Sequence, residues 1–383
     1  MEWKIPLSDI DLDDEEIEAV TKVLKSKWLS MGPVTQKFEK EFADYLGVKH
    51  AFGVSSGTAA LHIALKALGI EEGDEVIVPS LTFVATANSV LYCGAKPIFA
   101  DIISLNNFNI SPDDISEKIT NKTKAITVVH YGGYPCDMDA IMEIAKAHNL
   151  KVIEDAAHAP GAEYKGRKCG TIGDVGCFSF FANKNLVTGE GGMIVTNDDA
   201  LAEKIRVMRS HGMTTLTWDR HKGHAHSYDV VDMGFNYRIN EMASALGLVQ
   251  LKKLNENNGR RKKIVEGYRK RLEDISEISV PFKNHKEKSS YHIFPILLAE
   301  DIARNEFIDK LKEKGIQTSI HYPPIHLFTY YRKMFGFEEG ILPKTEFVGE
   351  HEITLPLYPV MGKEDVKFIT ERISEQAIND CEK

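Results

Sequence analysis

The sequence is poor in cysteine and has no surplus of positive charge. Its five cysteines are scattered and contain no Cys-x-x-Cys pair, which argues against a disulfide framework and favours a reducing compartment. The formal net charge of −9 argues against a general affinity for nucleic acid or for acidic membrane surfaces. Internal repeats and low-complexity tracts are also missing from the 383 residues, so we expect a globular protein with a large core.

Long hydrophobic runs are absent as well. The first residues contain no apolar segment of the kind found in secretory signals. The most apolar stretch, residues 76–100, is interrupted by two prolines, an asparagine and a lysine, and we do not expect it to span a bilayer. These features predict a cytoplasmic protein without a membrane partner.

Strand-like and helix-like segments alternate through the first half of the chain. The strand-like segments are residues 75–79, 97–101, 125–130 and 151–155, and residues 141–147 between them have apolar side chains at helical spacing. This alternation predicts an α/β fold, in which helices cover both faces of a large and mostly parallel sheet. Two further runs, at 174–181 and 192–196, are expected to pair as antiparallel strands.

A smaller α+β domain is expected at the C-terminal end. A long helix from Asn240 to about Leu272 would lead into strands at 291–298 and 317–322, a helix at 305–314 and a final helix from Lys363. We place the division after residue 250. Residues 1–250, with a helical segment at the start, would form the large domain, and residues 251–383 the small one.

Lys184 follows a run of aromatic and small residues and precedes a glycine-rich stretch. A lysine in such semi-apolar surroundings has a lowered pKa, because desolvation disfavours the charged ammonium. The uncharged amine is a nucleophile that can form an imine with a carbonyl compound. The alternative is a lysine whose stem packs while its ammonium reaches water.

Asp155 stands at the end of a strand-like segment, upstream of Lys184. Open α/β sheets bind ligands at the carboxyl ends of their strands. An aspartate there can pair with the ring nitrogen of a bound pyridine and keep it protonated. The alternative is that Asp155 caps the segment that follows.

Ser56, Gly57 and Thr58 precede residues 59–68, a helix-like run with an apolar stripe. Free backbone N–H groups, hydroxyls and the helix dipole at such a start suit a phosphate group, although an ordinary N-cap is the alternative. A phosphate site, a partner for a pyridine nitrogen and an imine-forming lysine together predict pyridoxal 5′-phosphate as cofactor.

Eight short motifs give the chain a family resemblance that runs from residue 5 to residue 368. They are WLSMGP at 28–33, SGTAAL at 56–61, PSLTFVATAN at 79–88, EDAAH at 154–158, SFFANKN at 179–185, GEGG at 189–192, GFNYR at 234–238 and HYPPIH at 321–326. In content and order the chain resembles the sugar aminotransferases of the DegT/DnrJ/EryC1/StrS family, which are fold-type I pyridoxal-phosphate enzymes. The resemblance implies that the large domain binds the cofactor.

The resemblance also implies roles around the cofactor ring. Lys184 would hold the cofactor covalently and later move protons, and Asp155 would pair with the pyridine nitrogen. Phe83 would lie against the ring, although a core phenylalanine is the alternative. His158 would lie beside the phenolic oxygen, at a position where many relatives carry Gln.

For the cofactor's phosphate, the resemblance implies Gly57, Thr58 and Ser179 as ligands. The Ser179 hydroxyl could instead bond to backbone. Asn236 would reach the phosphate bound by the neighbouring subunit, which predicts a homodimer with active sites at the interface, although a simple turn is the alternative.

The substrate-binding residues implied by the resemblance are Leu29, Ser30, Met31, Tyr322 and His326. A structural role is the alternative for His326.

No metal site is expected. The cluster of His221, His224 and His226 has no cysteine nearby, so we interpret it as a solvated or substrate-facing loop.

The resemblance implies transfer of an amino group from L-glutamate to a keto sugar nucleotide. We favour a nucleotide-linked 4-keto-6-deoxyhexose that becomes a 4-amino sugar, for a glycan such as lipopolysaccharide or for a secondary metabolite. Family members that are sugar dehydratases carry His where this chain has Lys184, which favours amino transfer over dehydration. Three more functions are compatible with the motifs: amino transfer at C3, transfer to a cyclitol ketone, and regulation by a protein that binds the cofactor without turnover.

Overall fold

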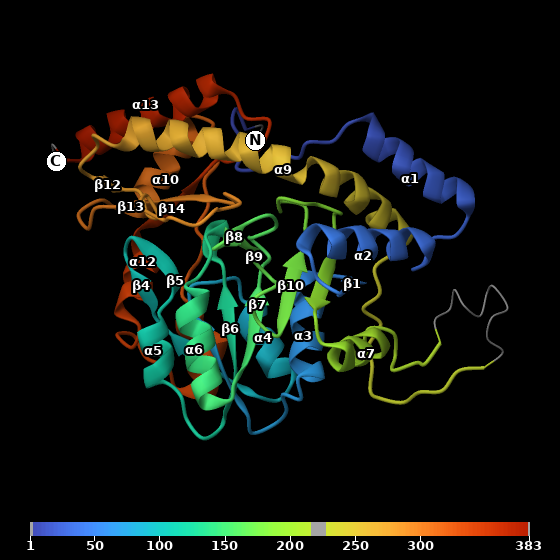
Figure 1. Ribbon diagram of the computed structural model, residues 1–383. Helices are drawn as coiled ribbons and strands as arrows, with labels where there is room; N and C mark the ends of the chain where they lie inside the picture. Colours follow the sequence, from blue (N-terminus) through green and yellow to red (C-terminus); the bar gives the residue numbers. More distant parts are fainter. Residues whose placement is uncertain (1–2, 216–226, 382–383) are drawn as a thin grey trace.

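The computed structural model describes residues 3–215 and 227–381, and a seven-stranded sheet lies at its centre (Figure 1). In spatial order the strands are β1 (His50–Val54), β11 (Gly192–Thr196), β10 (Val175–Ser179), β7 (Lys151–Asp155), β6 (Thr123–Val129), β2 (Glu75–Pro79) and β3 (Lys96–Ala100). β11 pairs antiparallel with both of its neighbours, and the other pairs are parallel. The α/β prediction and the predicted antiparallel pair are confirmed.

Helices cover both faces of this sheet. One face packs against α3 (Gly57–Ala67), α4 (Ala85–Tyr92) and α7 (Asp199–Met208), and the other against α2 (Pro33–Leu46), α5 (Pro112–Glu117), α6 (Met138–His148) and the first half of α9 (Glu241–Leu272). Side chains on a strand alternate between faces, so Val152 of β7 packs with α6 while Ile153 packs with α3. Both side chains are fully buried, which is why this strand reads as a continuous apolar run.

A second apolar core lies in the C-terminal part of the chain. It joins a three-stranded antiparallel sheet to α10, α13 and the second half of α9; the elements are β12 (Ile278–Ser279), β13 (Phe294–Leu298), β14 (Glu352–Leu355), α10 (Arg304–Glu313) and α13 (Lys363–Cys381). α9 contacts α1 (Asp14–Ser26) and α2 near one end and α13 near the other (Figure 1). The division after residue 250 falls inside this helix, and it stays a prediction.

Short elements connect these parts: β4 (Ile102–Ser104), β5 (Asn107–Ile110), β8 (Glu163–Tyr164), β9 (Arg167–Lys168), α11 (Thr329–Phe335), α12 (Pro343–His351) and the 3-10 turns η1 (Tyr131–Gly133) and η2 (Ile325–Leu327). Across residues 3–215 and 227–381, no helix combines the length and the hydropathy that crossing a membrane requires.

The strand predicted at residues 317–322 does not form. Ser319 makes a single bridge with Thr354, and the third strand of the small sheet is β14 instead. The backbone N–H of His321 donates to the side chain of Glu352 at 2.7 Å rather than to a neighbouring strand. Two prolines follow at positions 323 and 324, and they have no N–H to contribute to a ladder. The segment is therefore held by a single bridge and a side-chain contact and not by a strand ladder.

Candidate active site

A cavity of about 400 Å³ lies at the edge of the sheet where β1, β10, β7, β6 and β2 end. Its walls include residues at or just beyond these strand ends, among them Thr58, Thr86, Val129, Asp155 and Ser179. Because these five strands run in the same direction, segments far apart in the sequence converge on one hollow. A larger hollow, of about 770 Å³, lies elsewhere and is lined by none of the predicted site residues.

Lys184 lies in the turn after β10 and lines the cavity. Its backbone N–H donates to the carbonyl of Phe181 at 2.9 Å, which closes the turn. Burial lowers the pKa of Lys184 to about 8, and the nearby carboxylate of Asp155 opposes that fall. A larger fraction of this amine than of an unperturbed lysine is therefore uncharged near neutral pH and able to attack a carbonyl carbon.

Asp155 ends β7 and is buried beside the same cavity. Its Oδ2 accepts a hydrogen bond from the Thr86 hydroxyl at 2.8 Å, and its Oδ1 accepts one from the N–H of Ala157 at 3.2 Å. Burial raises the pKa of Asp155, and these hydrogen bonds and the charge of Lys184 oppose the rise. Because neither hydrogen-bond donor is charged, a cation placed against this carboxylate would be strongly favoured.

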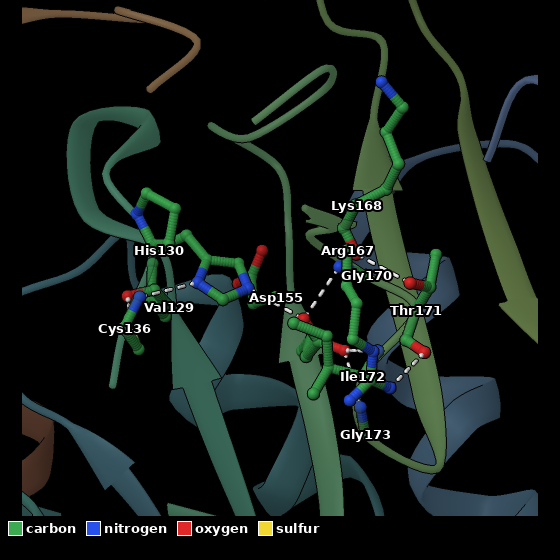
Figure 2. A network of polar contacts seen from close by, with 12 residues as sticks. Val129, His130, Cys136, Asp155, Arg167, Lys168, Gly170, Thr171, Ile172 and Gly173 are labelled. Carbon is green, nitrogen blue, oxygen red and sulfur yellow. Dashed lines mark hydrogen bonds and ion pairs between the residues drawn. The ribbon is translucent and has the colours of Figure 1, made fainter. Parts of the chain in front are cut away.

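The neighbouring Glu154 fixes the end of β7. Its carboxylate accepts three backbone N–H groups of the segment 170–173 at 2.5 to 2.7 Å, and Nε2 of His130 contacts it at 2.9 Å. Nδ1 of His130 accepts the N–H of Cys136, so the neutral ring carries its proton on Nε2 and donates it to Glu154. Figure 2 shows His130 and the segment 170–173 on two sides of this strand end. The network holds β6 and β7 together at the point where Asp155 meets the cavity.

Gly57 and Thr58 form the first turn of α3 at the cavity wall. Ser56 caps the helix, because its hydroxyl accepts the N–H of Ala59 at 3.1 Å. Among the described residues, no hydrogen bond uses the backbone N–H of Gly57 or Thr58. A Cβ at position 57 would lie 2.8 Å from the Cβ of Ser179, so glycine is what allows the helix start to lie so close to β10. Free N–H groups, a hydroxyl and the helix dipole make this wall suitable for an anion.

His158 and Tyr322 meet at the cavity wall. Nε2 of His158 lies 3.0 Å from the Tyr322 hydroxyl, and Nδ1 accepts the N–H of Gly132 at 3.3 Å. Burial holds the pKa of His158 well below its usual value, so the ring is neutral and donates from Nε2 to Tyr322. The Tyr322 hydroxyl therefore keeps its own proton available for the cavity.

Phe83 also lines the cavity. Its side chain is 57% exposed, which rules out the alternative of a core phenylalanine.

Four predicted residues lie outside this cavity on the surface or in a loop. Leu29, Ser30 and Met31 belong to the loop between α1 and α2, where the carbonyl of Leu29 accepts the N–H of Glu241 at 3.0 Å. Asn236 is exposed and does not line the cavity of its own chain. Its contact with a neighbouring subunit stays a prediction.

His326 is buried away from the cavity. Its Nδ1 lies 2.8 Å from the hydroxyl of Ser80, and its Nε2 lies 3.0 Å from the carboxylate of Glu346. Since both ring nitrogens are engaged inside the protein, this arrangement favours the structural alternative over contact with a sugar nucleotide.

The cluster of His221, His224 and His226 lies outside the described residues. Within the described ranges, no three or more histidine, cysteine or acidic side chains gather in a way that would hold a metal ion.

Thr86 and Asn183 belong to the site, although neither was predicted from the sequence. Thr86, in the first turn of α4, lies within hydrogen-bonding distance of the Thr82 hydroxyl and donates to Asp155. Oδ1 of Asn183 is buried and has no hydrogen-bond partner within the described part of the chain. Both residues stand inside motifs, at 79–88 and 179–185, whose other members were assigned roles, and this position is the signal that would have found them.

Comparisons with known proteins agree with the fold. The sequence model of the DegT/DnrJ/EryC1/StrS aminotransferase family matches residues 10–374. The chain is 41% identical to the GDP-perosamine synthase of Escherichia coli O157:H7 over 376 aligned residues. The aligned region covers 97% of this chain and 98% of that protein.

Two solved structures extend this comparison. PseC of Helicobacter pylori, an aminotransferase involved in the biosynthesis of pseudoaminic acid, is 32% identical and has a TM-score of 0.91 over 99% of this chain and 100% of its own. The PLP-form of Spr1654 of Streptococcus pneumoniae, a putative sugar aminotransferase, is 30% identical and has a TM-score of 0.90 over 99% of each chain.

Proposed function

Since the chain belongs to the DegT/DnrJ/EryC1/StrS aminotransferase family, we propose that it transfers an amino group from L-glutamate to a keto sugar nucleotide, with pyridoxal 5′-phosphate as cofactor. The acceptor that we favour is a nucleotide-linked 4-keto-6-deoxyhexose, which would become a 4-amino sugar. The similarity to a GDP-perosamine synthase and to PseC supports a sugar as the acceptor. The observation that carries the proposal is that Lys184 and Asp155 line one cavity, with the amine partly uncharged and the carboxylate free to accept a cation.

The residues of the cavity fit pyridoxal phosphate. Gly57, Thr58 and Ser179 would hold the phosphate, because two backbone N–H groups are free there and position 57 has no Cβ. The carboxylate of Asp155 would pair with the protonated ring nitrogen, which supplies the positive charge that favours its ionised form. The buried Oδ1 of Asn183 is a further acceptor at this wall.

When bound, pyridoxal phosphate supplies an aldehyde carbon that takes up an amino group and a ring that withdraws the electron pair left by a departing proton. Lys184 would hold the cofactor through its amine and, once the donor amine displaces it, would remove and return the proton at the substrate carbon. A pKa of about 8 suits both roles, because the amine is nucleophilic and its ammonium gives up the proton readily. The exposed ring of Phe83 would lie against the cofactor, and His158 would lie beside its phenolic oxygen.

We also propose that the enzyme works as a homodimer in the cytoplasm. Asn236 and the loop with Leu29, Ser30 and Met31 do not line the cavity of their own chain. In an assembly of two copies, Asn236 would reach the phosphate bound by the partner, and the loop would contact the sugar nucleotide. The free hydroxyl proton of Tyr322 suits an oxygen of that substrate.

The test is a mass-spectrometric screen of keto sugar nucleotides in the presence of L-glutamate. The wild-type protein is expected to yield an amino sugar nucleotide and 2-oxoglutarate. Lys184→Ala is expected to lower turnover by on the order of 10³-fold or more, because the proton-moving base is lost, while cofactor binding persists. Lys270→Ala, which removes an exposed lysine of α9, is the matched control. Normal turnover in Lys184→Ala would contradict the proposal.

A further inference from the structure

A buried acid that the proposed mechanism does not use lies behind one wall of the cavity. Glu352, the first residue of β14, is fully buried. Its Oε2 accepts the backbone N–H of His321 at 2.7 Å, and its Oε1 is hydrogen-bonded to the hydroxyl of Thr354. The same hydroxyl oxygen lies 2.8 Å from Nδ1 of the His321 ring. A carboxyl group, a hydroxyl group and an imidazole ring therefore form one continuous chain of hydrogen bonds.

The cavity lies at the imidazole end of this chain. His321 lines the cavity, and because Nδ1 is engaged by Thr354, Nε2 is the ring nitrogen left for a ligand. The positive charge of Lys184 is close enough to lower the pKa of His321, after the larger effect of burial. The backbone around His321 is held in place, since the Tyr131 hydroxyl donates to its carbonyl oxygen.

The Thr354 hydroxyl has one proton, so the chain has two arrangements. When Glu352 is ionised, the hydroxyl donates to the carboxylate, and Nδ1–H of His321 donates to the hydroxyl oxygen, which leaves Nε2 as an acceptor. When Glu352 is protonated, its O–H donates to the hydroxyl oxygen, the hydroxyl donates to Nδ1, and Nε2–H faces the ligand as a donor. The state of a carboxyl group outside the cavity thus decides which nitrogen of a cavity residue carries the proton.

We propose that Glu352, Thr354 and His321 form a proton relay that connects the cavity to a buried carboxylate and sets the tautomer of His321. Its use rests on the proposed function, because an amino-acid donor arrives as an ammonium ion and must lose a proton before its nitrogen can attack. In that step an N–H bond of the donor breaks and an Nε2–H bond forms. The Nδ1 proton passes to the Thr354 oxygen, whose own proton passes to Oε1. Glu352 therefore ends as the neutral acid and the donor as the neutral amine, and no other group changes charge.

Relative acidities favour the carboxyl group as the final holder of the proton. Burial lowers the pKa of His321 to about 4, so the ring alone cannot keep a proton taken from an aliphatic ammonium ion. Burial raises the pKa of Glu352 to about 8, and its hydrogen bonds to Thr354 and His321 and the charge of Arg304 oppose the rise. Of the two groups at the ends of the relay, the carboxyl group is therefore the one that can hold the proton, and the ring passes it on without becoming an imidazolium.

The ionisable groups that face this relay come from each element packed around it. They are Arg304 of α10, Tyr131 of η1, Tyr322 beside His321, and Lys184, His158 and His292 toward the cavity. Burial holds the pKa of both of these histidines well below the usual value, and that of both tyrosines above it. The pKa of Lys184 is also about 8, so a rate profile would mix its titration with that of Glu352.

A readout of the tautomer itself avoids this overlap. We would measure ¹⁵N resonances of the cofactor-loaded protein labelled in its histidine rings, with the His321 signals assigned by their absence from His321→Asn. Between about pH 6 and pH 10, the His321 proton is expected to move from Nε2 to Nδ1 as pH rises, with a midpoint near pH 8. In Glu352→Gln the amide must accept from the N–H of His321 and donate to Thr354, which locks the proton on Nε2 over the whole range.

Three further variants separate a relay from a purely structural contact. Thr354→Val removes the hydroxyl at nearly constant shape and is expected to abolish the switch, whereas Thr354→Ser keeps the hydroxyl and the switch. Glu350→Gln changes an exposed acid two residues from Glu352. It is the matched control and should leave the midpoint unchanged.

Two results would overturn the proposal: a wild-type His321 ring that keeps one tautomer over the whole pH range, or an unchanged switch in Glu352→Gln. If Glu352→Gln does not fold, the contrast between the two Thr354 variants decides. Since no substrate is present, a missing aminotransferase activity would leave this result intact.

Discussion

Lys184 and Lys270 carry the same ammonium group in different surroundings. Lys270 is exposed on α9, whereas Lys184 lines the cavity, where burial lowers its pKa to about 8. The negative charge of Asp155 acts in the opposite direction and raises the pKa of Lys184. At the scale of the residue, reactivity is therefore decided by how much water and how much opposite charge surround the amine.

The opposing effects of burial and of Asp155 on the pKa of Lys184 can be measured on the cofactor-free protein. Labelling of Lys184 by an amine-specific reagent, followed by peptide mass spectrometry, is expected to rise with pH around a midpoint near 8, since only the uncharged amine reacts. Asp155→Asn removes the charge that supports the ammonium, so the midpoint should move to lower pH. A midpoint that rises in Asp155→Asn would contradict the assigned geometry. Labelling of Lys270, whose side chain is exposed on α9, provides the internal control.

Thr86 offers a second test at this scale, because its hydroxyl is one of two donors to the buried Asp155. Thr86→Val is expected to destabilise the protein by roughly 1.5–3 kcal/mol, as for a hydrogen bond to a charged group, and to weaken cofactor binding. Urea unfolding and a cofactor titration measure the two effects. Thr82→Val loses only a hydroxyl–hydroxyl bond of 3.2 Å and should cost less. Equal costs for the two variants would argue against a special role for Thr86.

At the scale of the secondary-structure element, the start of helix α3 brings backbone N–H groups into the site. α3 begins at Gly57, and the approach of its first turn to β10 depends on the missing side chain at that position. The capping hydroxyl of Ser56 satisfies the N–H of Ala59 and leaves the two earlier N–H groups for a ligand. The geometry of a helix start, more than any single side chain, makes this wall suitable for a phosphate.

Gly57→Ala and Gly259→Ala compare two helical glycines with opposite surroundings. An alanine Cβ at position 57 would lie 2.8 Å from the Cβ of Ser179, whereas at position 259 it would meet nothing within 4 Å. We expect Gly57→Ala to lower cofactor affinity by about tenfold or more, since a shift of the helix start costs at least about 1.4 kcal/mol of binding. Gly259→Ala should bind normally and gain roughly 0.5–1 kcal/mol of stability. Cofactor titration and thermal unfolding measure both, and normal affinity in Gly57→Ala would contradict the phosphate assignment.

The whole molecule gathers residues that no local segment could bring together. Five strand ends converge on the cavity, and the loop that carries His321 and Tyr322 reaches the same cavity from the C-terminal part of the chain. Asn236 and the loop at 29–31 remain outside it in a single copy. A complete site therefore requires a second copy under the proposed dimer.

Mixing two inactive variants tests this requirement. If Asn236 serves the partner's site, Lys184→Ala and an Asn236→Asp variant are each expected to be nearly inactive. After co-expression, each heterodimer of the two should contain one site with both native residues and so have about half of the wild-type activity, as expected for a closed two-fold dimer. With random pairing about half of the dimers are heterodimers, so the mixture should recover about a quarter of the wild-type activity. Two variants at the same position, Lys184→Ala and Lys184→Met, should recover nothing when mixed. No recovery in the first mixture, with heterodimers present, would argue that Asn236 acts within its own subunit.

Much of the fold was predictable because its signals are local. β7 and β2 have the bounds expected from their apolar runs. The long helix α9 begins where it was expected, since Asn240 is its N-cap. The segment 317–322 was wrongly assigned because its backbone is tied by the side chain of Glu352, which lies thirty-one residues from His321. The apolar neighbours of Phe83 in the sequence could not decide between core and cavity, because the exposure of its ring depends on which distant segments pack against it. For His326, the sequence left a structural and a substrate-binding role open. The contacts of its two ring nitrogens with Ser80 and Glu346 favour the structural role.

The order of residues alone determined the alternating elements, the glycine at the start of α3 and the eight motifs of the family, because these depend on spacing along the chain. Only the tertiary structure decided the electrostatic state of the site. The lowered pKa of Lys184 and the raised pKa of Asp155 arise from burial, and burial is a property of the folded molecule. The same holds for the chain of hydrogen bonds from Glu352 to His321, whose members come from distant segments and meet only when the small sheet packs beside the cavity.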